Sequence, residues 1–258
     1  MEINTVKKIA MIPVMFDSTR VPKKNLILLN GQTMTHYVVK TCIESNVFDE
    51  IYINSESLIA KEIADELGVN FFYRNPEHGG SKCTMENVSV KCNGNRCQTH
   101  DHFVYDFIQN IEADILFQVH TTTPLIKVDT IKNFVYYFEK NEFHSLFTAI
   151  SEQKETVFRE SPVNFSYKKK NPTQTLEKVL KMTSGMAAWD VNLYKKRYQE
   201  YSNKKNTPSF GDSTGWFEIP FIEGIDVDNW DDLEIVNSIL YYRNQKMKSE
   251  KICYYHNF

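Results

Sequence analysis

The sequence predicts an α/β fold, with a mostly parallel central sheet flanked by helices. Short apolar runs of strand length occur at residues 9–16, 48–54 and 69–74, and segments with helical spacing of apolar residues separate them at 33–46 and 57–67. Because two strand–helix units follow one another, we expect parallel strands joined by right-handed crossovers. With 41% hydrophobic residues among 258, the chain can fill the core of one large domain, residues 1–258.

Turn and cap residues support these elements. Asn30-Gly31 is a turn signal, and Thr33 directly after it can cap the first helix. Ser55 or Ser57 can cap the second helix, and Gly68 is placed to close it. The boundaries of the first half are therefore predicted by local chemistry as well as by apolar spacing.

The second half of the chain continues the alternation of strands and helices and then departs from it. Helices are expected over residues 101–111, 128–140 and 191–201, and strands over 114–120 and 145–150, the last of which should complete the core sheet. Residues 161–190 mix turns with short strand candidates, and residues 202–215 form a polar loop.

A basic loop follows the first strand, in the segment IPVMFDSTRVPKKNL (residues 12–26). Arg20, Lys23 and Lys24 place three cations within five residues around Pro22. In α/β proteins ligands bind where strands open into such loops, and fixed positive charge suits a polyphosphate. The spaced glycines of dinucleotide-binding and P-loop proteins are missing. The net charge of −3 argues against nucleic acid as a partner, so we expect either a small anionic ligand or a solvated basic loop.

An acidic segment lies near the other end of the chain, FIEGIDVDNWDDLEIV (residues 221–236). It is predicted to be a strand followed by a helix that starts near Asn229. Because residues two apart on a strand point to the same side, Asp226 and Asp228 can aim both carboxylates at one hard cation such as Mg²⁺. Asp231 and Asp232 suit a helix N-terminus and need no further function.

These two segments resemble the motifs of the CMP-sugar synthetases. In the basic loop, the matches to the acylneuraminate cytidylyltransferase pattern are Ile12, Pro13, Pro22, Lys24, Asn25 and Leu26. The matches to the 3-deoxy-manno-octulosonate cytidylyltransferase pattern are Ser18, Thr19, Arg20, Pro22 and Lys24. Met15 stands where both patterns have Arg. The acidic segment resembles the family motif IDIDTPEDL, and HTTTPL (residues 120–125) resembles its QPTSPL loop.

The resemblance implies a Rossmann-like nucleotide-diphospho-sugar transferase fold and transfer of CMP from CTP to an acidic sugar, with release of pyrophosphate. It implies a magnesium cofactor held by Asp226 and Asp228, and catalytic roles for Lys24, Arg20 and Asp228. The nucleotide-binding residues it implies are Pro13, Met15, Ser18, Arg20, Lys24, Asn25 and Arg74. The acceptor-binding residues it implies are His120, Thr122 and Gln174. It also implies a homodimer, through an arm at residues 153–190 that reaches over the neighbouring subunit.

Residues 75–99 look like an insertion relative to that family. They contain Cys83, Cys92 and Cys97, followed by His100. Such a spacing could supply zinc ligands, but it lacks paired C-x2-C knuckles, so plain thiols are the alternative. Five cysteines without a signal-peptide layout indicate reduced thiols in the cytoplasm, and the sequence contains no apolar run of membrane-spanning length.

Three functional interpretations stay open from the sequence. The acceptor could be a nonulosonic acid such as an acylneuraminate, an octulosonate or a phosphonate. A non-catalytic nucleotide-binding homologue could have lost activity with the Arg at position 15, where Met15 now stands. A metal-sensing or thiol-regulated module could be built on the cysteine loop. Pyrophosphate release, CTP binding without turnover and stoichiometric zinc, respectively, would distinguish them.

Overall fold

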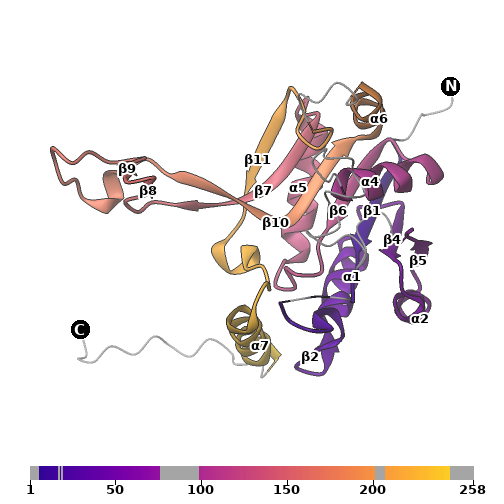
Figure 1. Ribbon diagram of the computed structural model, residues 1–258. Coiled ribbons are helices and arrows are strands. Elements are labelled where there is room, and N and C mark those ends of the chain that lie inside the picture. The colour runs from indigo at the N-terminus through magenta and orange to yellow at the C-terminus, as the bar shows by residue number, and fades with distance from the viewer. Residues whose placement is uncertain (1–5, 17, 19, 76–98, 201–206, 245–258) are drawn as a thin grey trace, which may run out of the picture.

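The computed structural model describes residues 6–16, 18, 20–75, 99–200 and 207–244. Within these residues the chain forms a seven-stranded sheet with helices on both faces (Figure 1). The strand order is β11-β7-β10-β6-β1-β4-β5. Thr19 and the cysteines at 83, 92 and 97 lie outside the described residues.

The sheet is mostly parallel, as predicted. Its parallel pairs are β1–β4, β1–β6, β4–β5 and β7–β11, and β10 runs antiparallel to both β6 and β7. The strands are β1 (Lys8–Pro13), β4 (Glu50–Ser55), β5 (Asn70–Tyr73), β6 (Ile115–Val119), β7 (Ser145–Glu152), β10 (Val179–Asp190) and β11 (Thr214–Glu218). The expectation that residues 145–150 complete the sheet was wrong, because β10 inserts beside β7 and β11 forms the edge. β10 contains Ala187 and Ala188, which have low strand propensity, so its sequence gives a weak strand signal.

The helices follow the predicted order. They are α1 (Met34–Ser45), α2 (Leu58–Leu67), α4 (Thr99–Asn110), α5 (Val128–Lys140), α6 (Val191–Glu200) and α7 (Trp230–Asn244). The Thr33 hydroxyl accepts a hydrogen bond from the His36 backbone amide, and the Ser57 hydroxyl accepts one from the Ile59 amide. Gly68 closes α2 with a φ of 67°. These three predicted caps are therefore confirmed.

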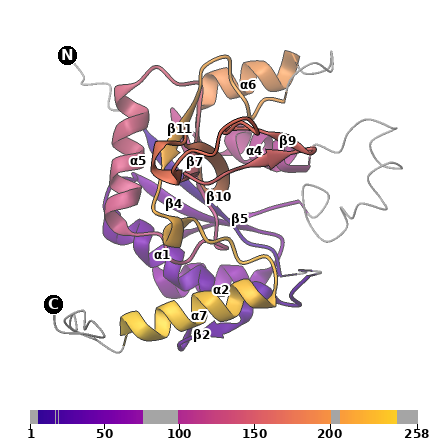
Figure 2. The same ribbon diagram turned by 90° about the vertical axis from the view of Figure 1, so that its left-hand side faces the viewer.

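The Asn30-Gly31 turn is also confirmed. It joins β2 (Leu28–Leu29) to β3 (Gln32–Thr33), with φ of 48° at Asn30 and 87° at Gly31. Positive φ at both turn residues matches the type I′ hairpin turn that Asn-Gly favours. α7 packs against β2, at the end of the molecule opposite α6 (Figure 2).

Two apolar layers hold the helices to the sheet. One layer joins α1, α2 and α5 to one face, with Val38, Ile63 and Phe134 among its buried residues. The other joins α4 and α6 to the opposite face through Phe107 and Tyr194. None of the described helices has the length and apolarity that a membrane crossing would need.

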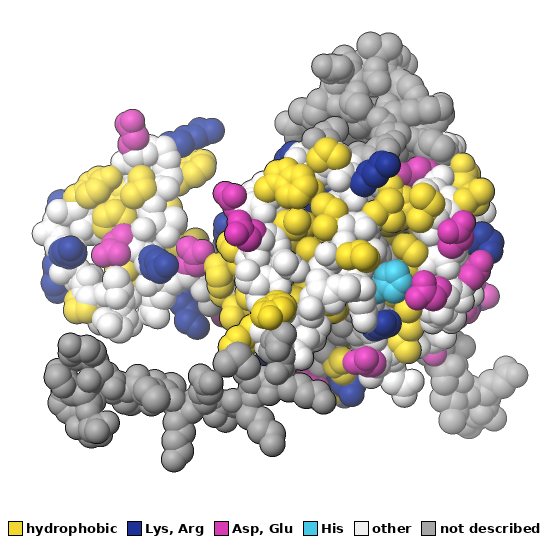
Figure 3. Space-filling model, turned by 90° about the horizontal axis from the view of Figure 1, so that it is seen from below, with side chains coloured by type: hydrophobic (Ala, Val, Ile, Leu, Met, Phe, Trp, Pro, Cys, Tyr) yellow, Lys and Arg dark blue, Asp and Glu magenta, His cyan; other side chains and the backbone are white. Residues whose placement is uncertain are grey.

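An arm projects from the body within residues 153–190 (Figure 1). It contains β8 (Val157–Phe158), β9 (Ser161–Pro162) and the short 3₁₀ helix η2 (Thr173–Thr175), and it returns to the sheet along β10. Phe158 and Tyr167 on this arm are 65% and 71% exposed. Seen from below, the arm forms a lobe beside the body and carries exposed hydrophobic side chains (Figure 3).

Candidate active site

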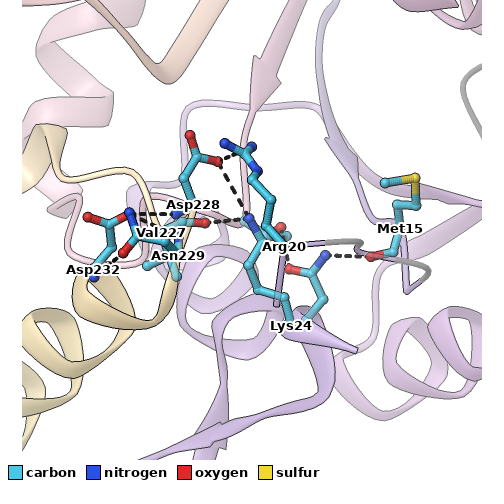
Figure 4. A network of polar contacts seen from close by, with 9 residues as sticks. Met15, Arg20, Lys24, Val227, Asp228, Asn229 and Asp232 are labelled. Atoms are coloured by element: carbon cyan, nitrogen blue, oxygen red, sulfur yellow. Dashed lines mark hydrogen bonds and ion pairs between the residues drawn. The ribbon is translucent and has the colours of Figure 1, made fainter. Parts of the chain in front are cut away.

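Lys24 is anchored in a buried position at the end of the basic loop. Val21 is buried, Lys23 adopts a left-handed conformation with φ of 53°, and Lys24 then opens the 3₁₀ helix η1 (Lys24–Leu26). The Lys24 residue is only 7% exposed, and its Nζ donates a hydrogen bond to the Val227 carbonyl (Figure 4). This contact joins the basic loop to the acidic segment, which follows 203 residues later in the chain.

The charged groups of the two segments meet around Asp228 (Figure 4). An Arg20 guanidinium nitrogen lies 2.6 Å from Asp228 Oδ1, and Lys24 Nζ lies 3.8 Å from the same oxygen. The Arg20 side chain is 65% exposed, so it can leave this contact without disturbing the core. Lys24 is fixed by its buried backbone contact.

Burial lowers the pKa of Lys24, and the charge on Arg20 acts in the same direction. Asp228 and Asp226 oppose the shift, because their carboxylates favour the charged ammonium. An ammonium held in a partly dry site interacts more strongly with a phosphate than one in bulk water does. The arrangement can therefore neutralise charge on a phosphate group near Lys24.

The strand predicted over residues 221–228 was wrong. Residues Phe221–Gly224 form the 3₁₀ helix η4, and residues 225–228 have no strand partner among the described residues. A single backbone bond holds this stretch, from the Val227 amide to the Thr122 carbonyl at 2.8 Å. The alternation of apolar and acidic residues resembles a strand because Val227 is buried and Asp228 is half-exposed.

Asp232 supports the backbone of Asp228. Its carboxylate accepts hydrogen bonds from the amides of Asp228 and Asn229 at 2.9 and 3.0 Å. The Asn229 side chain in turn accepts a bond from the Asp232 amide at 3.0 Å. This reciprocal cap starts α7, which agrees with the interpretation that Asp232 serves the helix N-terminus.

Asp226 offers an oxygen that can accept a cation. Its Oδ1 is buried and receives no hydrogen bond from the residues that the structure describes. A buried carboxylate oxygen without a donor is costly, so a bound cation would satisfy it. Among the described residues no group of three or more His, Cys, Asp or Glu side chains is arranged to hold a metal ion. Mg²⁺ commonly binds one or two carboxylates together with substrate phosphates, so the residues that would hold it are Asp226 and Asp228, and this assignment stays a prediction.

Asn25 fixes the loop that follows β1. Its side-chain amide donates to the Met15 carbonyl at 2.8 Å, and its carbonyl accepts from the Thr121 hydroxyl at 2.9 Å. Pro13 ends β1, and Ser18 is half-buried in the same loop. Met15 thus contributes its backbone carbonyl to the hydrogen bonds that hold this loop in place.

Arg74 is buried and also holds the loop that follows β1. Its guanidinium donates to the Val14 carbonyl at 3.0 Å, pairs with Glu56 and lies over the Phe103 ring. Arg74 is 2% exposed. These contacts hold the backbone beside Met15, and a contact between Arg74 and a nucleotide base stays a prediction.

Two of the three predicted acceptor-binding residues lie beside the site. The Thr122 carbonyl accepts a hydrogen bond from the Val227 amide. His120 lies two residues earlier, directly after the end of β6. Burial lowers the pKa of His120 to about 3, so its imidazole is neutral. Gln174 lies in η2 on the arm, where its backbone carbonyl accepts a hydrogen bond from the Gln153 side-chain amide. Its role in acceptor binding stays a prediction.

Sequence reasoning missed several residues that position the site. Thr121 holds Asn25, and the buried Glu223 carboxylate accepts bonds from the Lys127 amide at 3.1 Å and the Thr130 hydroxyl at 2.6 Å. Gln118, completely buried in β6, lies against His120. A polar residue within the apolar run DILFQVH was the available signal for Gln118. The sequence around Glu223 gave no comparable signal.

A protein-family model described as "Cytidylyltransferase" matches residues 9–221. An N-acylneuraminate cytidylyltransferase of Streptococcus agalactiae serotype V is 29% identical over 162 residues, which cover 57% of this chain and 36% of that protein. A pseudaminic acid cytidylyltransferase of Campylobacter jejuni subsp. jejuni serotype O:2 is 24% identical over 84% of this chain and 83% of its own length. A 3-deoxy-manno-octulosonate cytidylyltransferase of Lawsonia intracellularis is 26% identical over 50% of this chain and 44% of its own. The chain thus matches little more than a third of the streptococcal relative.

Solved structures share the fold. A CMP:2-keto-3-deoxy-manno-octonic acid synthetase complexed with CTP superposes with a TM-score of 0.68 at 15% identity, over 92% of this chain and 99% of that one. A 4-diphosphocytidyl-2C-methyl-D-erythritol synthase from Anaerococcus prevotii superposes with a TM-score of 0.64 at 13% identity, over 92% and 96%. At these identities the superpositions establish the architecture.

Proposed function

Because this chain belongs to the cytidylyltransferase family, we propose that it transfers CMP from CTP to a hydroxyl group of an acidic sugar and releases pyrophosphate. The observation that carries this proposal is the convergence of Lys24, Arg20 and Asp228, from opposite ends of the chain, at one place. The acceptor proposed is a nonulosonic acid of the acylneuraminate type, which is supported by the names of two of the relatives.

The reaction forms a bond between the acceptor hydroxyl oxygen and the α-phosphorus of CTP. It breaks the bond from this phosphorus to the oxygen that bridges to the β-phosphate, and it releases pyrophosphate and the hydroxyl proton. Such phosphoryl-type transfers depend on positioning and on neutralising phosphate charge. Lys24 is held rigidly enough to stabilise charge that develops at the α-phosphate and on the leaving pyrophosphate. Arg20, on an exposed side chain, is free to exchange Asp228 for phosphate oxygens when the nucleotide binds.

Asp226 and Asp228 would hold Mg²⁺, which neutralises phosphate charge when bound. The release of Arg20 toward the phosphates would free Asp228 for this role. The buried, unpartnered Oδ1 of Asp226 supports the same assignment. The backbone of residues 13–15, held by Asn25 and Arg74, would contact the cytidine and the phosphates.

A homodimer is part of the proposal. The arm projects away from the body and exposes apolar side chains, and exposed patches of this kind mark interaction sites. Light scattering of the purified chain should give twice the monomer mass, and Phe158→Glu, on the arm, should shift it toward the monomer. A wild-type chain that stays monomeric at tens of micromolar would contradict the dimer.

Pyrophosphate release from CTP in the presence of magnesium tests the function. The acceptors should include an N-acylneuraminate, a pseudaminic acid, an octulosonate and a phosphonate, with UTP and ATP replacing CTP as matched controls and EDTA replacing the metal. The expected result is acceptor-dependent release with CTP only. Magnesium-dependent CTP binding without turnover of any acceptor would favour a non-catalytic homologue instead.

A further inference from the structure

Glu223 is a buried acidic residue to which the proposed reaction gives no role. It is 2% exposed and lies in η4, on the chain path from β11 to α7, three residues before Asp226 (Figure 1). A buried carboxylate is costly unless hydrogen bonds or a cation compensate for its lost hydration. The groups that hold this carboxylate therefore indicate what it does.

The partners of Glu223 belong to the N-terminus of α5. Its Oε2 accepts hydrogen bonds from the Lys127 backbone amide at 3.1 Å and from the Thr130 hydroxyl at 2.6 Å, and Lys127 Nζ lies 3.5 Å from Oε1. Lys127 is the N-cap residue of α5, and its side chain makes no cap hydrogen bond. In a capping box, a Glu in the first turn accepts from the N-cap amide. Glu223 performs this role from a distant segment, so it ties η4 to α5.

Gly224 holds η4 on its other side, against the sheet. A Cβ at this position would lie 2.7 Å from Ile150 Cγ2 and 3.1 Å from Thr183 Cγ2. The backbone therefore approaches β7 and β10 more closely than a residue with a side chain could. Between the Glu223 carboxylate and this packing, η4 has a fixed position.

Asp226 and Asp228 lie on the short stretch that joins η4 to α7. At the α7 end, the Asp232 carboxylate accepts from the Asp228 amide (Figure 4). In the middle, the Val227 amide donates to the Thr122 carbonyl at 2.8 Å. At the η4 end the stretch depends on the position of η4 itself. Three residues span at most about 10 Å, so a displacement of η4 would be passed on to Asp226.

The loop at residues 120–127, which joins β6 to α5, connects the acidic and basic sides of the site. Near its start, the Thr121 hydroxyl donates to the Asn25 side chain of the basic loop at 2.9 Å. At its end, the Lys127 amide donates to Glu223. Glu223 therefore ties the acidic segment to the same loop that holds the basic one.

We propose that Glu223 is a positioning residue for Asp226 and Asp228, and that its tie to α5 sets the geometry in which these two carboxylates bind Mg²⁺. The inference rests on the proposed function and adds a residue that touches neither the nucleotide nor the metal. The buried Oδ1 of Asp226, which has no donor among the described residues, is the atom whose placement depends on this tie. Groups that orient metal ligands typically change metal affinity by about 10- to 100-fold when they are removed.

Magnesium-dependent binding of CTP tests the inference without turnover. Calorimetry in the absence of acceptor gives the Kd of CTP with EDTA and with Mg²⁺, and the ratio of these two values is the metal enhancement. Glu223→Ala should lower the metal enhancement about tenfold. It should leave the Kd measured with EDTA within twofold of wild type, because both metal carboxylates and both loop cations remain in the chain. A residue with a purely structural role would not change the two Kd values differently.

Two variants test the hydrogen bonds themselves. Glu223→Gln keeps an oxygen that can accept from the Lys127 amide and the Thr130 hydroxyl, so its metal enhancement should stay within twofold of wild type. Thr130→Val removes one of the two donors from α5, outside the acidic segment, and should lower the metal enhancement about threefold. If Glu223→Ala does not fold, Thr130→Val decides.

Asp101→Ala is the matched control. Asp101 is also a buried carboxylate, 6% exposed, in the first turn of α4 on the opposite face of the sheet. It accepts hydrogen bonds from the hydroxyls of Tyr194, Thr207 and Ser209. Asp101→Ala should lower Tm, as Glu223→Ala does, and leave the metal enhancement within twofold of wild type.

The outcomes separate this inference from the proposed function. Metal enhancement within twofold of wild type in folded Glu223→Ala and Thr130→Val would overturn the positioning role, and so would an equal loss in Asp101→Ala. If the wild type still releases pyrophosphate with CTP and an acceptor, the proposed function stands in either case. CTP binding by the wild type that does not respond to Mg²⁺ would overturn the inference together with the metal assignment.

Discussion

The most informative single change is Lys24→Met, because it removes one charge from the site at nearly constant volume. Lys24 Nζ donates to the Val227 carbonyl and lies 3.8 Å from Asp228 Oδ1. A unit charge about 4 Å from a phosphate oxygen, at an effective dielectric of about 20, interacts by about 4 kcal/mol. Removal of one preorganised donor from an enzyme site costs about 3 kcal/mol. At 1.36 kcal/mol per factor of ten, these two figures predict that kcat falls by roughly 100- to 1,000-fold.

The same change should leave the protein folded. Lys24 is 7% exposed, and Met has a side chain of similar length that can occupy the same space. The variant loses a charged hydrogen bond, worth about 1.5–3 kcal/mol, but it no longer buries an ammonium, whose desolvation already lowers the pKa of Lys24. We therefore expect the free energy of unfolding to change by less than about 2 kcal/mol, because these two terms oppose each other.

The assay is pyrophosphate release at saturating CTP and acceptor, paired with urea unfolding. Lys23→Met is the matched control, since Lys23 is the exposed neighbour and its substitution removes the same charge. We expect kcat of Lys23→Met to stay within threefold of wild type. A folded Lys24→Met protein with kcat within threefold of wild type would refute the assignment of Lys24 to the phosphates.

Three further predictions follow from the site. Asp228→Asn should lower kcat on the order of a hundredfold and raise the magnesium concentration needed for the half-maximal rate. Asp231→Asn, on the exposed first turn of α7, should do neither. Near-normal turnover in folded Asp228→Asn would remove the metal assignment. Asn25→Ala leaves the Met15 carbonyl and the Thr121 hydroxyl unpaired and should lower the free energy of unfolding in urea by about 1–3 kcal/mol, and a loss below about 0.5 kcal/mol would contradict this. Burial lowers the pKa of His120 from 6.5 to about 3, so between these pH values the unfolded chain binds a proton that the folded chain does not. The free energy of unfolding should therefore fall as the pH drops below 6.5, by up to about 1.4 kcal/mol per pH unit. His120→Gln should remove this part of the pH dependence measured by urea midpoints at pH 7 and pH 5, and identical slopes in the two proteins would show that His120 is not the source.

The sequence predicted those parts of the fold that local chemistry determines. Thr33, Ser57 and Gly68 each satisfy backbone groups within a few residues of themselves, so their cap roles can be recognised without knowing the tertiary structure. The approach of Lys24 to Asp228 was predicted through resemblance to a family in which both motifs occur in this order. Spacing alone could not place them together, because about 200 residues separate them in the chain.

β11 was missed, and β10 was predicted only as short strand candidates within residues 161–190, because the partners of both strands are remote in the chain. β10 returns from the arm, its first residues are exposed on the projection, and its buried part contains small residues that carry little strand preference. The extended stretch at residues 225–228 shows the opposite error. Its alternation of Ile225, Asp226, Val227 and Asp228 is what a strand would show, yet it is held by one backbone bond to Thr122. Period-two alternation reports which side chains are buried and gives no information on strand pairing.

β10 is also the element that lies beside His120, a residue that the resemblance assigns to acceptor binding. In an all-parallel sheet the strand beside β6 would end where β6 ends, and both would open into loops at the same edge. Because β10 runs antiparallel to β6, the first residues of β10 lie at the edge where β6 ends. There the Gly185 carbonyl accepts a hydrogen bond from the His120 amide. The register of β10 shifts between Met182 and Ala187, and Thr183, Ser184 and Met186 in this irregular stretch line a hollow beside His120. The strand that lies beside His120 is thus continuous with the arm, because β10 (Val179–Asp190) begins on the projection and ends in the sheet.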